Sequence, residues 1–169
     1  MELEEFRRAF QQTTDNGIFF DNASMGPVAP AVTQAMTACM QLRQAMPMKY
    51  YQYAQQVFPE CRARLARLIG GQPEEIAFTE NVTYGINSAA GALPLEPGDN
   101  VILCDREFAS NVYPWLRLER SRGVEARMVP NDGGGLTVGL LERYADRRTR
   151  AVSVSSVEFS DGYTADLEA

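Results

Sequence analysis

The spacing of apolar residues predicts alternating strands and helices over the second half of the chain. Residues 101–104 form a continuous apolar run, which is typical of a strand buried on both faces. Residues 76–79, 124–129 and 151–157 are further β-favouring segments, and apolar residues recur at helical spacing over 82–93, 111–122 and 136–144. Four strands interleaved with three helices predict an α/β fold, a mostly parallel sheet with helices on both faces.

The first half of the chain is predicted to be mainly helical. Apolar spacing favours helices over residues 2–12, 30–43 and 56–69, and the last of these is followed by Gly70 and Gly71, a C-cap signal. Residues 18–20 are expected to form a brief strand. The aromatic stretch 46–53 breaks the helical register and is expected to be a loop.

The segment 76–87 predicts a strand, a tight turn and the start of a helix. Asn81 stands where the helix N-cap is expected, directly before the first helically spaced apolar residue. The first turn of a helix carries unpaired N–H groups and the positive end of the helix dipole, so with the hydroxyls of Thr79 and Thr83 it is able to bind a phosphate. An ordinary capped helix has the same amides, and this interpretation stays open beside the anion site.

Composition excludes several classes of function. The formal net charge of the 169 residues is -6, which disfavours binding to nucleic acid or to an anionic membrane, and no apolar run approaches the roughly 18 residues of a membrane span. The three cysteines are widely spaced, as expected for free thiols in a reducing cytoplasm. With no histidine, the chain has no Ser-His-Asp machinery and no usual zinc site, and we expect no metal. Lys49 is its only lysine.

Four segments in order resemble one enzyme family. Residues 19–23, 76–87, 97–102 and 105–115 are similar in sequence and spacing to the class V aminotransferases, which include cysteine desulfurases, isopenicillin N epimerase and kynureninase. The run E-F-x-S-N-x-x-P-W resembles the epimerase-like branch. The resemblance implies a pyridoxal 5′-phosphate (PLP) enzyme of fold-type I, with residues 18–169 forming the N-terminal part of the large domain after a helical segment at 1–17.

The resemblance also implies roles for individual residues. Val82 and Thr83 match the position that binds the cofactor phosphate, and Phe108 matches the residue that stacks on the pyridine ring. Glu158 matches a position near the cofactor's phenolic oxygen, although a one-residue shift would place Phe159 there. Asn22 and Ala23 match a segment near the substrate end of the site. Phe108 as a core residue and Glu158 as a solvated loop residue are the alternatives.

The family's Schiff-base lysine and its pyridinium-pairing aspartate lie beyond the matched region, so we assign no catalytic residue here. We expect the N-terminal part of a longer enzyme that acts on an amino acid as an epimerase, desulfurase, lyase or aminotransferase, is homodimeric at full length, and is inactive as this chain alone. The alternative is a complete, non-catalytic α/β module for anion binding or interaction.

Overall fold

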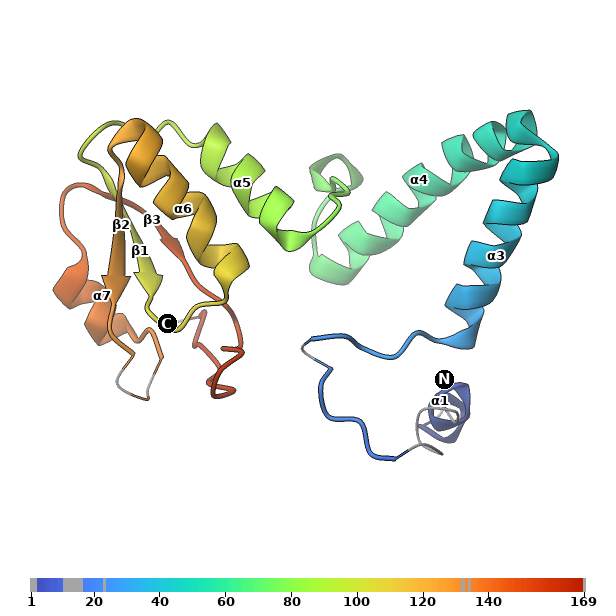
Figure 1. The fold of residues 1–169 in the computed structure, drawn as a ribbon, viewed down its shortest axis with the longest axis horizontal. Helices are drawn as coiled ribbons and strands as arrows, with labels where there is room; N and C mark the ends of the chain where they lie inside the picture. Colours follow the sequence, from blue (N-terminus) through green and yellow to red (C-terminus); the bar gives the residue numbers. More distant parts are fainter. Residues whose placement is uncertain (1–2, 11–16, 23, 132, 134, 169) are drawn as a thin grey trace. The chain divides into compact units, whose positions relative to one another are not determined.

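The chain forms two compact units, Met1–Ala77 and Phe78–Ala169 (Figure 1). A computed structural model describes residues 3–10, 17–22, 24–131, 133 and 135–168. In the described part of the chain, no helix has both the length and the apolar character needed to cross a membrane.

The first unit is helical. Its elements are α1 (Leu3–Ala9), α3 (Pro30–Ala45), α4 (Pro47–Ile69) and the 3₁₀ turn η1 (Pro73–Glu75). Helices α3 and α4 each begin with proline, whose missing N–H costs nothing in a first helical turn. Helix α4 ends at Gly70, whose φ of 74° is the left-handed conformation that favours glycine at a C-cap.

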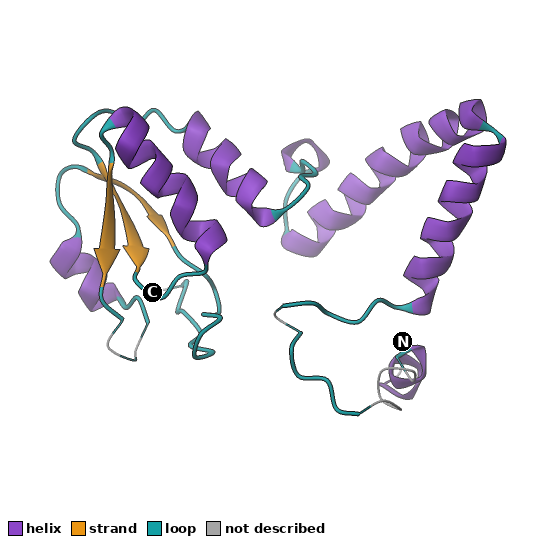
Figure 2. Cartoon of the chain, viewed as in Figure 1, coloured by secondary structure: helices purple, strands orange, loops and turns teal. Residues whose placement is uncertain are grey.

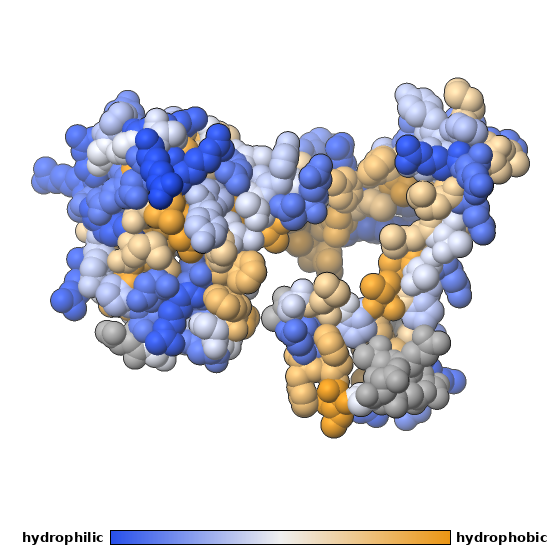
Figure 3. Space-filling view, viewed as in Figure 1, coloured by the Kyte–Doolittle hydropathy of each residue, from blue (hydrophilic) through white to orange (hydrophobic). Residues whose placement is uncertain are grey.

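Much of the apolar surface of the α3–α4 hairpin is exposed. Helix α3 has no buried residue and α4 only Ala66, while Met36 and Met40 are 64% and 62% exposed. Figure 3 shows such apolar, orange side chains at the surface of the two helices. The hairpin therefore contributes little buried core of its own.

Two expectations for the first unit are wrong. Residues 46–53 are not a loop, because the helical register breaks only around Met46 and α4 starts at once with Pro47. Residues 18–20 form no strand and pair with no other strand in the described residues; Ile18 and Phe20 are 85% and 86% exposed. A strand needs a hydrogen-bonded neighbour, which local sequence cannot supply.

The second unit is a three-stranded parallel sheet with helices on both faces, which confirms the predicted architecture (Figure 2). Its strands lie in the order β2-β1-β3, and all pairs are parallel. In chain order the elements are α5 (Val82–Ala92), β1 (Asn100–Cys104), α6 (Ala109–Arg122), β2 (Glu125–Val129), α7 (Val138–Tyr144) and β3 (Thr149–Ser153).

Alternate residues of the central strand serve opposite faces of the sheet. Val101 and Leu103 belong to a core with Trp115 and Leu118 of α6 and Ala90 of α5. Ile102 and Cys104 belong to a second core, on which residues of α7 pack. All five residues of β1 are at most 1% exposed. The continuous apolar run in the sequence follows from this burial on both faces.

A polar network fixes the register of the strands where they begin. The buried Asn100 side chain donates to Asp146 at 2.9 Å and accepts from the Thr149 hydroxyl at 2.8 Å. Arg127 on β2 forms ion pairs with Asp146 at 2.8 Å and Glu125 at 2.7 Å. Its hydrogen bond is the main cause that lowers the pKa of Asp146 to about 2.

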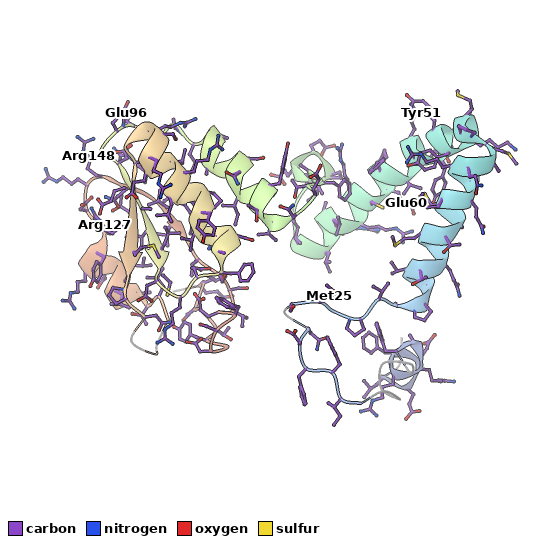
Figure 4. The ribbon with its side chains drawn as sticks, in the orientation of Figure 1. Met25, Tyr51, Glu60, Glu96, Arg127 and Arg148 are labelled. Carbon is purple, nitrogen blue, oxygen red and sulfur yellow. The ribbon has the colours of Figure 1, made fainter. Side chains whose placement is uncertain are left out.

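Other charged residues add to this end of the sheet. Asp99 is 2% exposed and lies near the guanidinium groups of Arg148 and Arg150. The Glu96 N–H donates to Asp99 at 3.0 Å. Figure 4 shows Glu96 and Arg148 at the end from which the strands start.

Two further segments differ from expectation. Residues 76–79 form no strand, since in the described residues the sheet ends at β2 and β3 and no neighbour pairs with them. Strand β3 stops at Ser153 rather than 157, because the Ser155 N–H bonds to the Glu107 side chain instead of another strand. Beyond β3, Thr164 forms an antiparallel bridge with Val157.

Candidate functional site

The carboxyl ends of β1 and β3 and the first turns of α5 and α6 carry the side chains of the candidate site. In a parallel sheet all the strands end at one edge, so the loops that follow them meet there. The chain leaves β1 through residues 105–108 into α6 and leaves β3 through residues 154–158. Both loops come together in the structure, as the contacts below show.

The predicted cap of α5 is confirmed. The Asn81 side chain accepts a hydrogen bond from the Tyr84 N–H at 2.9 Å, and the Asn81 backbone is extended, as in an N-cap. The N–H groups of Val82 and Thr83 donate to no acceptor in the described residues. These two amides therefore stay available to an anion at the positive end of the helix.

Two hydroxyls join the first turns of α5 and α6. Thr83 Oγ1 lies 2.9 Å from Ser110 Oγ, 27 residues away in sequence. Only one of the two hydroxyl hydrogens lies between the oxygens, so the other remains free to bond an anion. Ser110 was not among the predicted site residues; its place shortly after the apolar strand 101–104, in the first turn of the next helix, was the available signal.

Phe108 lies at the N-cap position of α6 and is 52% exposed. Its ring meets that of Phe159 edge-on, with centroids 5.2 Å apart and planes at 82°. Such T-shaped pairs are a favoured aromatic geometry. The alternative of Phe108 as a core residue is wrong, because about half of this side chain reaches solvent.

Glu107 joins the loop after β1 to the loop after β3. One of its carboxylate oxygens accepts from the Ser155 N–H and the other from the Ser155 hydroxyl at 2.8 Å. A second contact connects β3 to α6: the hydroxyl of Ser153, the last residue of β3, donates to the side-chain oxygen of Asn111. Glu107 and Asn111 are 7% and 8% exposed. These buried contacts fix the two loops to each other, and the sequence did not predict them.

Asp105 makes the matching connection to β2. Its N–H donates to the Val129 carbonyl at 3.0 Å, and its carboxylate accepts from the Asn131 N–H at 2.9 Å. The loop after β2 is thus attached to the end of β1. The sequence 132–135, with three consecutive glycines, predicts a turn after β2, and residues 132 and 134 lie outside the described residues.

Glu158 is buried at the same edge without a hydrogen-bond donor. It is 2% exposed, and neither carboxyl oxygen receives a hydrogen bond from a donor group. Burial, followed by the negative charges of Glu107 and Asp161, raises the pKa of Glu158 to about 7. Burial likewise raises the pKa of the neighbouring Cys104 thiol. The alternative of Glu158 as a solvated loop residue is therefore wrong.

The remaining predicted positions, Asn22 and Ala23, belong to the first unit. Asn22 is an exposed residue of the first unit, and its N–H donates to the Phe20 carbonyl at 2.9 Å. Ala23 lies outside the described residues. The substrate-binding role of both stays a prediction. Among the side chains that the structure describes, no three or more His, Cys, Asp or Glu residues gather in a way that could hold a metal ion.

Comparison with protein families identifies the chain. The family model described as aminotransferase class-V matches residues 18–169. The chain belongs to the class-V aminotransferase family. The resemblance carried by the four sequence segments is thereby confirmed.

Curated members of this family that are similar to the chain include cysteine desulfurases. The probable cysteine desulfurase of Methanothermobacter thermautotrophicus is 34% identical over 99% of this chain and 43% of that protein. The cysteine desulfurase of Dickeya dadantii is 36% identical over 58% of this chain and 25% of that enzyme. The chain thus spans less than half the length of the curated relatives it matches.

Solved structures share the fold of this chain. A lysine-to-alanine mutant of C-DES, with glycine covalently linked to its PLP cofactor, matches with a TM-score of 0.86 and 23% identity over 95% of this chain and 43% of that one. The cysteine desulfurase CsdA of Escherichia coli matches with a TM-score of 0.84 and 24% identity over 99% and 44%. These likenesses confirm the predicted fold-type I class.

Proposed function

We propose that this chain is part of a PLP-dependent enzyme that acts on an amino acid, and that its own residues hold the phosphate and the ring of the cofactor. The observation that carries the proposal is the junction of α5 and α6, where two unbonded first-turn amides lie beside the Thr83–Ser110 hydroxyl pair. An ordinary capped helix has the amides but does not need a second helix to bring a hydroxyl to them.

The residues present fit the cofactor in three places. The amides of Val82 and Thr83 and the free hydroxyl hydrogen suit a phosphate dianion, which the helix dipole also stabilises. The half-exposed ring of Phe108 offers an apolar face for a pyridine ring. Glu158, whose pKa is raised to about 7, suits a phenolic oxygen as long as it is neutral.

Bound PLP supplies an electron sink for bonds broken at the α-carbon of an amino acid. In the proposed enzyme, this chain binds and orients the cofactor, while Glu107 keeps the two site loops together through Ser155. No residue of this chain is assigned the covalent role of a Schiff-base lysine. The named relatives, which are cysteine desulfurases, support an amino acid as the substrate and desulfuration as one of the reactions. Epimerisation, a lyase reaction and transamination are the other reactions proposed for the enzyme. We further propose a homodimer for the full-length enzyme.

Binding of pyridoxine 5′-phosphate to the 169-residue chain tests the phosphate site. This compound has the phosphate and the phenolic oxygen of PLP but no aldehyde, so it does not react with Lys49 or the N-terminus. Because hydrogen bonds to charged groups contribute about 1.5–3 kcal/mol, Thr83→Val should weaken calorimetric binding about tenfold or more. Thr83→Ser should keep most of the affinity, and Thr33→Val, an exposed change on α3, should leave it unchanged.

The outcomes separate the proposal from its alternative. Saturable binding that Thr83→Val leaves intact would contradict the assigned phosphate site, and no saturable binding at all would contradict cofactor binding by this chain. Inorganic phosphate that binds as tightly as pyridoxine 5′-phosphate would favour a non-catalytic anion-binding module, because the ring would then contribute nothing.

A further inference from the structure

Residues 156–165 form a short antiparallel hairpin after β3. Its backbone bonds run from the N–H of Ala165 to the Ser156 carbonyl at 2.9 Å and from the N–H of Glu158 to the Tyr163 carbonyl at 2.8 Å. Both partners of each bond belong to the hairpin. Because an isolated two-stranded hairpin is marginally stable at best in water, this one depends on its contacts with the rest of the second unit.

Three side chains of the hairpin contact the neighbouring loops. The ring of Phe159 lies edge-on to that of Phe108, with centroids 5.2 Å apart. The ring of Tyr163 lies so close to Gly135 that a side chain at that glycine would overlap it. The third is Glu158, which is 2% exposed and whose carboxyl oxygens accept no hydrogen bond within the described residues. Two of the contacts are therefore aromatic, and the third is a buried carboxyl.

The groups that act most strongly on the Glu158 carboxyl are acidic. Glu107, within hydrogen-bonding reach of it, and Asp105 follow β1, and Asp161 lies in the hairpin itself. The buried Cys104 thiol at the end of β1 adds no positive charge. Among the described residues, no ion pair joins Glu158 to an arginine or lysine. Burial first, and these negative charges next, hold the carboxyl in its neutral form.

Glu158 and Glu107 share one proton, and hydrogen bonding decides which of them keeps it. Glu107 accepts two hydrogen bonds from Ser155, which stabilise its ionised form, whereas Glu158 accepts none. A protonated Glu158 is able to donate its hydrogen to the Glu107 carboxylate, and this bond attaches the hairpin to the loop after β1. Once Glu158 ionises, the same contact brings two carboxylates together, and movement of the hairpin into water relieves the repulsion.

We propose that the hairpin 156–165 is a pH-sensitive flap at the carboxyl end of the sheet, closed by a hydrogen bond from Glu158 to Glu107 and loosened when Glu158 ionises. Phe159 follows Glu158 directly in the hairpin, so opening moves its ring away from Phe108. The candidate site thereby loses one of its two exposed rings. This inference concerns the chain without a ligand and does not depend on the proposed function.

The pKa of Glu158 sets the size of the effect. Burial, chiefly, raises that pKa from 4.5 to about 7 in the closed hairpin, and the rise is lost once the side chain reaches water. The closed state therefore binds the proton more tightly than the open state, so closure is favoured at low pH and weakens as the pH rises through about 7. Between pH 6 and pH 8 the ratio of closed to open hairpin should fall about tenfold.

Amide hydrogen exchange of the 169-residue chain, resolved by NMR, tests the flap. The N–H groups of Gly162 and Ala165 report on the hairpin, because a detached hairpin does not keep their hydrogen bonds. The N–H groups of β1 report on unfolding of the whole unit. Glu158→Gln has nearly the same shape and is able to donate to Glu107 at every pH. Glu142→Gln removes an exposed charge on α7 and serves as the matched control.

We expect the protection of the two hairpin amides, corrected for intrinsic exchange at each pH, to fall about tenfold from pH 6 to pH 8 in the unsubstituted chain and in Glu142→Gln, and to stay constant in Glu158→Gln. These amides should also exchange faster than those of β1, because the hairpin opens while the sheet stays folded. Constant protection in the unsubstituted chain, or the same fall in Glu158→Gln, would overturn the role of Glu158. Hairpin amides that are protected as strongly as those of β1 at both pH values would overturn the flap itself.

Discussion

The stability of the second unit should fall as the pH rises from about 5 to about 8, and Glu158→Gln should abolish most of that fall. The pKa of Glu158 is raised from 4.5 to about 7 in the folded chain, chiefly by burial. The folded state therefore holds this proton more tightly than the unfolded state. Its contribution is complete below about pH 4.5 and is lost as the pH rises through about 7.

The size of the effect follows from the same pKa. At about 1.4 kcal/mol for each pKa unit, the rise corresponds to about 3 kcal/mol of unfolding free energy lost between the two limits. Glutamine stays neutral at every pH. The variant should therefore match the unsubstituted chain near pH 5 and exceed it by about 3 kcal/mol at pH 8.

Trp115 provides the assay, because it is the chain's only tryptophan and lies in the core of the second unit at 5% exposure. Urea unfolding followed by its fluorescence at several pH values gives the free energy of that unit. Glu142→Gln, with the same change in charge at an exposed position, should show no comparable pH dependence. A constant difference between the chain and Glu158→Gln from pH 5 to pH 8 would refute the reasoning.

Three further predictions use the same tryptophan fluorescence. Asn81→Ala removes the N-cap of α5 and should lower the free energy of unfolding by about 1 kcal/mol, whereas Asn81→Asp keeps an acceptor and should lower it much less. An unchanged urea midpoint in Asn81→Ala would show that the cap is dispensable. Ser155→Ala should lower the free energy of unfolding by about 1.5 kcal/mol or more, because the buried Glu107 carboxylate loses a hydrogen-bond donor. Ser156→Ala, at an exposed position, should lower it little, and equal losses in the two variants would argue against the contact between the loops. Leu103→Ala, at the fully buried centre of the sheet, should lower the free energy of unfolding by about 2–5 kcal/mol. Leu167→Ala, at a position that is 66% exposed, should change it little, and similar losses in the two variants would contradict the assigned core.

Local signals made the helices after Gly71 predictable from the sequence. Asn81 before a helically spaced run, and Gly123 after another, mark boundaries through backbone chemistry that depends on few neighbours. The buried strand 101–104 was equally clear, because burial on both faces leaves no polar alternation. The expected strand at 76–79 failed for the opposite reason, since pairing with a neighbour is a property of the whole sheet.

The sequence predicted only those residues of the candidate site that lie in segments with a local sequence signal. Thr83 and Phe108 were proposed through family resemblance; Thr83 lies in the first turn of α5, and Phe108 is the N-cap of α6, which begins two residues before the expected start at 111. The hydrogen bonds between Glu107 and Ser155 and between Asn111 and Ser153 join residues 48 and 42 positions apart, and neither local sequence predicts such a contact. Burial of Glu158 likewise arises from how its loop folds back through Val157 and Thr164.

The two ends of the sheet carry different groups of residues, and this division determines which substitutions the fold should tolerate. Asn100, Asp146 and Arg127 set the alignment of the strands at the end where they begin, whereas the side chains proposed to bind the cofactor lie at the end where the strands finish. Random substitution at positions such as 108–110 and 156–159 should thus alter ligand preference while the strand register survives. A mutational library confined to that edge should yield mostly folded proteins, and one centred on the Asn100 network should yield few. Such a layout lets new specificities arise by drift in the loops without rebuilding the scaffold.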